Sequence, residues 1–230
     1  MLGDFQIADW VGFLFLVVVW VVYGRFADAL PHPLPMGKPP NLNAAMHRVR
    51  RQWMRRMVSR HDRIVDVVLT GHTVNSLAFF ASSSMIITAG LVGTLGSSGS
   101  AFRVLESLGF TQPTSQFVFQ LKIVGLIAIF VIAFYKFTWA LRQYNFLCAL
   151  IGSAPLPERH PSQEATDRFA GSASPMVLVV MTSFNGGIRA IYFAAAWLGW
   201  FIHPYAFIAA TPFITPALLK RHLRYASNAA

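Results

Sequence analysis

The 230-residue sequence contains few charged residues, few acids and a single cysteine. Only 12% of its residues are charged, whereas soluble globular domains carry roughly a quarter, so a soluble domain is disfavoured. Nine Asp and Glu accompany 19 Lys and Arg, which leaves most bases without an acid to pair with. Because Cys148 is the only cysteine, an internal disulfide and a cysteine-rich metal or iron–sulfur site are excluded.

The sequence also lacks the residue patterns of common catalytic sites. It contains no H-E-x-x-H, G-x-S-x-G or P-loop pattern. Apart from Asp9, at the outer edge of the first apolar run, no acid lies in a predicted membrane span. An intramembrane aspartyl protease or a carboxylate proton relay is therefore not expected, and the chain is predicted not to be an enzyme.

Histidines remain as candidate cofactor ligands. Of the seven, only His72 and His203 lie at predicted membrane depth or at its edge. The predicted topology places these two on opposite sides of the bilayer, about 30 Å apart, so they cannot share one haem. A lone ligand or a site between subunits stays open, but the sequence predicts neither a metal nor a cofactor.

Long apolar runs are what the sequence has in abundance. Hydrophobic residues make up 55% of the chain, with 20 Phe and 6 Trp, and a helix of about 20 apolar residues crosses a bilayer. The sequence predicts an all-α, multi-span transmembrane helical bundle that forms a single membrane domain over residues 1–230. The predicted spans are 7–23, 71–95, 116–141, 186–202 and 205–219.

A basic helix is predicted over residues 44–66, just before the second span. No proline interrupts the stretch from Asn43 to Leu95, so one long helix is expected to continue from the basic segment into the span. The apolar side of the basic helix is predicted to dock on lipid head groups or on the cytoplasmic end of the bundle itself. A nucleic-acid partner is not predicted, because no recognition module accompanies the charge. The residues assigned to this docking face are Trp53, Met57, Arg51 and Arg55.

The distribution of bases predicts the topology. Residues 25–63 contain nine Lys and Arg, residues 142–189 four and residues 220–224 three, whereas the predicted outside segments contain only Arg103. Cytoplasmic loops are enriched in Lys and Arg, so we expect a bacterial inner-membrane protein with its N-terminus outside and its C-terminus in the cytoplasm. A four-span alternative, which merges the last two spans, would leave the basic run at 220–224 outside.

Two lysines lie inside the third predicted span. Lys122 and Lys136 are 14 residues apart, which places them within about 40° of one line along a helix. Gly125, Ala133 and Ala140 lie close to the same line, so this side is expected to face protein. Both lysines are also close enough to the span ends to extend to the lipid head groups. For each lysine, burial against protein and extension to the head groups therefore both stay open.

A cationic site is hypothesised at the cytoplasmic leaflet, between the second, third and fourth spans. Positive side chains at membrane depth without acids suit an anion or a lipid head group. The alternative is that each of these side chains only extends to the interface or forms hydrogen bonds between helices. The cytoplasmic segment 142–185 is expected to end in a separate short helix, and Gly186 and Gly187 at its junction with the fourth span allow a bend or a close helix contact. The site residues are Lys136, Arg142, Arg189, Asn185, His72 and Asn75.

The chain resembles a family of small bacterial and plant integral membrane proteins classed as a domain of unknown function. The resemblance covers nearly the whole chain and rests most on the segment NGGIRAIYF, residues 185–193, together with Arg51, Trp53 and Met57. It implies a multi-span fold and no known activity. The expected function is a non-enzymatic accessory or scaffold component of a membrane assembly, as a homo-oligomer or complex subunit. A small transporter or channel for an anion or amphiphile is the alternative.

Overall fold

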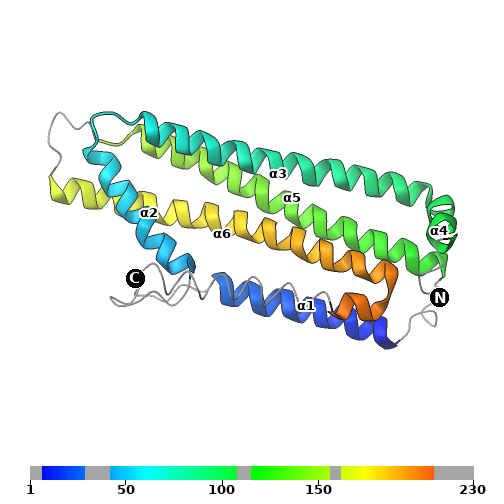
Figure 1. The fold of residues 1–230 in the computed structure, drawn as a ribbon. Helices are drawn as coiled ribbons and strands as arrows, with labels where there is room; N and C mark the ends of the chain where they lie inside the picture. The colour runs from blue at the N-terminus through cyan, green and yellow to red at the C-terminus, as the bar shows by residue number, and fades with distance from the viewer. Residues whose placement is uncertain (1–6, 29–41, 108–114, 156–161, 210–230) are drawn as a thin grey trace. The chain divides into compact units, whose positions relative to one another are not determined.

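The computed structural model describes residues 7–28, 42–107, 115–155 and 162–209, and within these ranges it contains helices and no strands. This confirms the all-α prediction (Figure 1). A short helix at 204–209 follows the last long helix. The named helices are α1 (Ile7–Asp28), α2 (Leu42–Ser59), α3 (Ile64–Gly96), α4 (Ser98–Ser107), α5 (Gln116–Gly152) and α6 (Gln163–Ile202).

Three helices among the described residues are long and apolar enough to cross a membrane: α3, α5 and α6, with 33, 37 and 40 residues. Each exceeds the roughly 20 residues that a span needs, so the chain has the character of a membrane protein. The count of five spans stays a prediction. The first predicted span, 7–23, is helical within α1, whereas most of the fifth, 205–219, lies outside the described residues.

The chain divides into two compact units, and α3, α5 and α6 contribute residues to both. In the described residues, unit 1 holds α1, α4 and the short helix at 204–209, and unit 2 holds α2. Unit 1 comprises residues 1–27, 82–134 and 186–220, and unit 2 comprises residues 28–81, 135–185 and 221–230.

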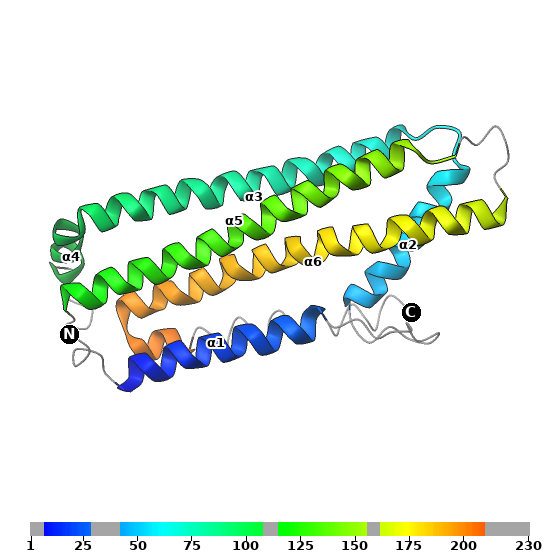
Figure 2. The same ribbon diagram turned by 180° about the vertical axis from the view of Figure 1, so that it is seen from behind.

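In unit 1 the chain reverses at His203, between the predicted fourth and fifth spans (Figure 2). The α6 helix ends at Ile202, and the His203 Nδ1 accepts a hydrogen bond from the backbone N–H of Tyr205 at 3.2 Å. The short helix then lies back beside α6 and α1 (Figure 2). A Cβ added at Gly199 would lie 3.3 Å from the backbone nitrogen of Phe207, so a glycine lets the returning chain approach closely.

The expectation of one continuous helix from the basic segment into the second span is wrong. The α2 helix ends at Ser59 and α3 begins at Ile64. The Asp62 carboxylate accepts the backbone N–H of Ile64 at 2.8 Å, a side-chain turn that competes with helix. In a continuous helix, Trp53 and Asp66 would lie about 20 Å apart, yet their side chains are hydrogen-bonded.

The expected break before the fourth span is also not observed. The α6 helix runs without interruption from Gln163 to Ile202 and includes Pro175 in its interior. Gly186 and Gly187 are both buried within it, so the glycine pair allows close packing of a continuous helix rather than a bend. The absence of a bend shows that two adjacent glycines do not by themselves end a well-packed helix.

Candidate functional site

Asp9 is the buried carboxylate of unit 1. It lies in the first turn of α1, where the positive end of the helix dipole favours an anion. Only 6% of its surface is exposed. The indole N–H of Trp200 donates a hydrogen bond to its Oδ1 at 2.5 Å. Asp9 and Trp200 lie far apart in the sequence, so this bond ties the start of α1 to the end of α6.

Lys122 supplies a buried positive charge in the same unit. Its ammonium group donates a hydrogen bond to the backbone carbonyl of Trp200 at 2.8 Å and lies 5.2 Å from the centre of the Trp200 ring. The Asp9 carboxylate attracts it electrostatically. The backbone carbonyl of Lys122 accepts the indole N–H of Trp197 at 2.9 Å. Lys122 is thus buried against protein and does not extend to the lipid head groups.

The tryptophans of this network are packed in an aromatic cluster that borders a cavity. The ring centroids of Trp197 and Trp200 are 4.9 Å apart, edge to face, and the Phe207 ring stacks on Trp200 at 5.2 Å. The cavity has a volume of about 230 Å³. Its lining residues are Asp9, Trp10, Phe13, Leu121, Val124, Gly125, Ala128, Trp197 and Trp200.

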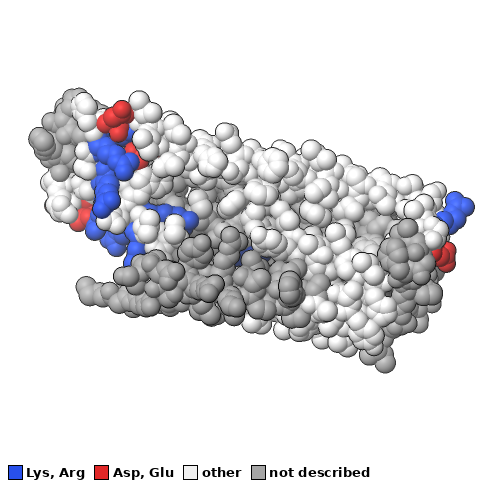
Figure 3. Space-filling model, in the orientation of Figure 1, with Lys and Arg blue, Asp and Glu red and all other residues white. Residues whose placement is uncertain are grey.

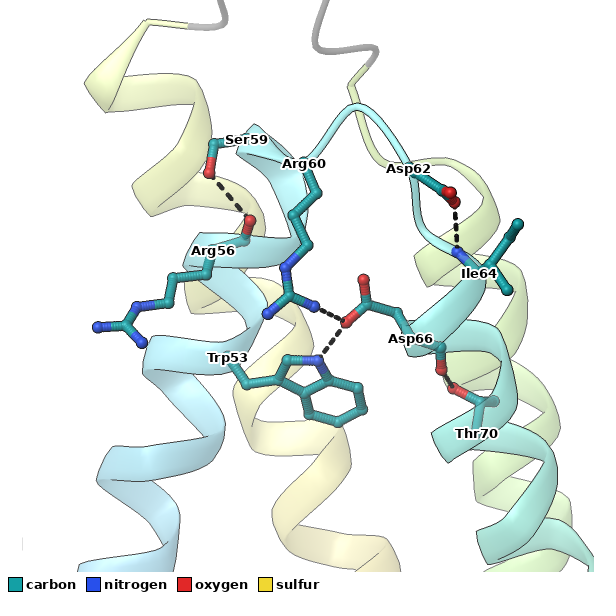
Figure 4. Close-up of polar contacts among 8 residues, drawn as sticks. All are labelled: Trp53, Arg56, Ser59, Arg60, Asp62, Ile64, Asp66 and Thr70. Carbon is teal, nitrogen blue, oxygen red and sulfur yellow. Dashed lines mark hydrogen bonds and ion pairs between the residues drawn. The ribbon is translucent and has the colours of Figure 1, made fainter.

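Asp66 is the buried carboxylate of unit 2. It lies in the first turn of α3 and is fully buried. Its Oδ1 accepts the indole N–H of Trp53 at 2.5 Å and a guanidinium N–H of Arg60 at 2.6 Å (Figure 4). Its Oδ2 has no hydrogen-bond partner among the described residues. Asp66 and Arg60 thus form a partly buried ion pair.

Two further arginines tie the ends of the helices in unit 2. The Arg63 guanidinium donates to the backbone carbonyls of Ala154 and Pro155, at 3.3 and 2.5 Å. The Arg55 guanidinium lies 2.8 Å from the Asp167 carboxylate at the start of α6. The basic helix α2 thus contacts the starts of α3 and α6 through Trp53 and Arg55, and Arg63, in the turn after α2, contacts the segment after α5.

The family comparison matches residues 11–227 with the family described as "Protein of unknown function, DUF599". The chain belongs to the DUF599 family. This confirms the resemblance to a family of unknown function, and it covers nearly the whole chain. No curated protein and no solved structure matches the chain. In the described part of this DUF599 chain, no group of three or more His, Cys, Asp or Glu side chains is placed to hold a metal.

The predicted docking face of α2 lies partly inside unit 2. Met57 is fully buried and Trp53 is half-buried, so this side of the helix packs against the DUF599 chain itself. Arg51 is exposed, and Arg55 is partly exposed in its ion pair with Asp167. Docking of lipid or a partner on this face stays a prediction, and the exposed arginines are the side chains available for such contacts.

The six residues of the hypothesised cationic site divide by exposure. Lys136, Arg142, His72 and Asn75 are exposed, and the Arg142 guanidinium lies 5.9 Å from the ring centre of Trp139. Asn185 and Arg189 are half-buried. Arg189 belongs to unit 1 and the other five belong to unit 2, so their convergence stays a prediction.

The network of Asp9, Lys122 and Trp200 is the feature that sequence reasoning missed. A signal for it was present: Asp9 is the only acid in the predicted spans, and Lys122 is a base in the third. The predicted topology places Asp9, Lys122 and Trp200 near the outer side of the membrane. Opposite charges at one depth attract strongly where the dielectric constant is low, so their pairing was foreseeable.

Proposed function

We propose that this DUF599 protein is a non-enzymatic scaffold subunit of a bacterial inner-membrane assembly, with its N-terminus outside and its basic helix in the cytoplasm. The observation that carries the proposal is the exposed apolar surface of α3. Only 17% of its most apolar segment is buried within the chain, against 44% for α5 and for α6. In a membrane, such a surface contacts lipid or a helix of another subunit.

The chemistry of α3 suits contact with a partner helix. Ala89 and Gly93 are both exposed and follow a small-xxx-small spacing, which lets helix backbones approach closely. A Cβ added at Gly90 or Gly93 would meet no atom within 4 Å. Small residues give lipid chains little surface to pack on, so they favour a helix as the neighbour.

The hydroxyl side chains on α3 are compatible with the apolar environment of a membrane. Each of five donates a hydrogen bond to the backbone carbonyl four residues earlier. Polar groups in a bilayer must be satisfied internally, and these bonds do so without a partner. The five residues are Thr70, Thr73, Ser76, Thr88 and Thr94.

The basic surface of α2 supports the proposed cytoplasmic side and a role for anionic lipid. Figure 3 shows Lys and Arg side chains gathered where α2 lies. Arg51 and Arg56 are exposed and form no ion pair with an acid of the described residues. Burial lowers the pKa of Arg50, but arginine stays charged in proteins. Each base near an anionic surface contributes about 1 kcal/mol of attraction.

The experiment is purification from native membranes in a mild detergent, followed by native mass spectrometry. We expect the wild-type chain to retain a second copy or another membrane protein, and Gly93→Leu to lose it. Gly71→Leu is the matched control, because Gly71 lies on the same helix and is equally open to added atoms. The proposal would be overturned in favour of a transporter by two results together. The protein would run alone, and vesicles reconstituted with it would pass anions, with that flux lost in Arg189→Ala.

A further inference from the structure

We propose that the cavity of unit 1 binds one hydrocarbon chain of a membrane lipid. The cavity measures about 230 Å³ and lies between α1, α5 and α6. Engineered apolar cavities of about 150 Å³ stay free of water and bind benzene, so this cavity has room for a longer apolar group. The inference does not depend on the scaffold role, since it concerns a different surface of the chain.

The polar groups around the cavity are already engaged with one another. The Trp200 indole N–H donates to Asp9, and the Trp197 indole N–H donates to the backbone carbonyl of Lys122. These bonds leave neither indole N–H available to a ligand. Almost all of the remaining lining is aliphatic or aromatic. An occupant is therefore recognised by shape and dispersion contacts, which selects a hydrocarbon over a polar molecule.

The exposed residues at the cavity rim indicate the surroundings from which the occupant enters. Trp10, Leu121 and Val124 are 52%, 43% and 45% exposed and also line the cavity. The last two lie on α5, a helix apolar enough to cross a membrane. In a bilayer this opening faces acyl chains, which are present there at higher concentration than any other apolar molecule.

Gly125 shapes the inner wall of the cavity. A Cβ added at this position would lie 2.2 Å from the Trp197 ring, so only glycine lets that ring approach α5 so closely. The ring is held there by its hydrogen bond to Lys122. The buried polar network thus fixes the aromatic wall against which the hydrocarbon chain would pack.

The test uses a phospholipid with a photoactivatable diazirine in its acyl chain, in vesicles of phosphatidylethanolamine and phosphatidylglycerol that hold the full-length protein. After illumination, peptide mapping locates the labelled residues. We expect labelling concentrated on Trp10 and on residues 121–128. Ala128→Leu, which places a larger side chain at the cavity, should reduce that labelling several-fold. Ala195→Leu makes the same change at an exposed position of α6 outside the cavity and should leave it unchanged.

A second measurement on the wild-type protein does not depend on how the variants fold. As the photoactivatable lipid is diluted with ordinary phospholipid, labelling at residues 121–128 should fall less than in proportion, because a binding site saturates. Labelling of exposed α3 residues such as Ile86 should fall in proportion. The proposal would be overturned by uniform labelling of all exposed helix faces, or by cavity labelling that persists fully in Ala128→Leu.

Discussion

The two units each contain a buried aspartate in the first turn of a helix, and each aspartate accepts a tryptophan indole N–H at 2.5 Å. The units differ in the positive charge nearby. Asp9 is attracted by Lys122, which is itself 6% exposed, whereas Asp66 pairs with Arg60, whose side chain is 39% exposed. Both carboxylates are therefore buried, but the positive charge is also buried in unit 1 and partly exposed to solvent in unit 2.

The difference follows from what surrounds each carboxylate. Asp9 and Lys122 are each 6% exposed, and Trp200, which contacts both, packs against the rings of Trp197 and Phe207, so loss of one charge leaves the other in a medium of low dielectric constant. Arg60 keeps part of its hydration, so losing its partner costs less. This comparison predicts the order in which substitutions destabilise the protein.

The largest effect is expected for Asp9→Ala. It leaves the Trp200 indole N–H without its acceptor and the buried Lys122 ammonium group without the negative charge nearby, and an unsatisfied buried donor costs about 1–3 kcal/mol, with more for a charged group. Thermal unfolding in detergent should show a large decrease in Tm. Asp9→Asn combined with Lys122→Met removes both charges and keeps a hydrogen-bond acceptor, so it should recover much of the loss. A double variant as unstable as Asp9→Ala would contradict the electrostatic explanation.

Gly125→Ala should come second. The added Cβ would lie 2.2 Å from the Trp197 ring, and overpacking of this kind costs about 1–3 kcal/mol. Gly71→Ala is the control, because its Cβ meets no atom within 4 Å and alanine favours helix by about 0.5–1 kcal/mol. The two variants should shift the Tm in opposite directions, and equal shifts would show that Trp197 is not held as described.

Asp66→Ala is expected to have a local effect that is comparable in size to that of Gly125→Ala and smaller than that of Asp9→Ala. It removes the acceptor for Trp53 and Arg60, and a hydrogen bond to a charged group contributes about 1.5–3 kcal/mol. The segment between α2 and α3 should loosen, so trypsin should cleave faster after Arg60 and Arg63 than in the wild type. Asp62→Ala, which removes only the bond to the Ile64 N–H, should accelerate cleavage less. Equal rates for Asp66→Ala and the wild type would mean that Asp66 does not hold α2.

The smallest effect belongs to Arg55→Ala. Its ion pair with Asp167 is 43% and 40% exposed at the two side chains, and exposed pairs contribute about 0.2–1 kcal/mol. Addition of salt should reduce the difference from the wild type further. A Tm decrease as large as that of Asp66→Ala would show that α2 is held mainly through α6.

Composition and apolar run length were sufficient to predict helices and membrane character, because lipid imposes both on the sequence. The break at Arg60 was not predictable from helix propensity. The hydrogen bond that stabilises the broken arrangement joins Trp53 and Asp66, which meet only in the folded chain. Lys122 and Lys136 lie close to one predicted line, yet the first is buried and the second exposed. Lys122 is held against Trp200, and one sequence carries no direct record of that contact.

The proposed topology is tested most directly by the sidedness of two charged regions of the protein, the basic helix α2 in unit 2 and α4 in unit 1. Cys148 is the only cysteine, so Cys148→Ser provides a background in which Arg51→Cys and Arg103→Cys can be labelled separately with a membrane-impermeant maleimide. With the N-terminus outside, Arg103→Cys should react once the outer membrane is opened, and Arg51→Cys should react only after the inner membrane is also permeabilised. Reaction of Arg51→Cys with the inner membrane intact would contradict this topology.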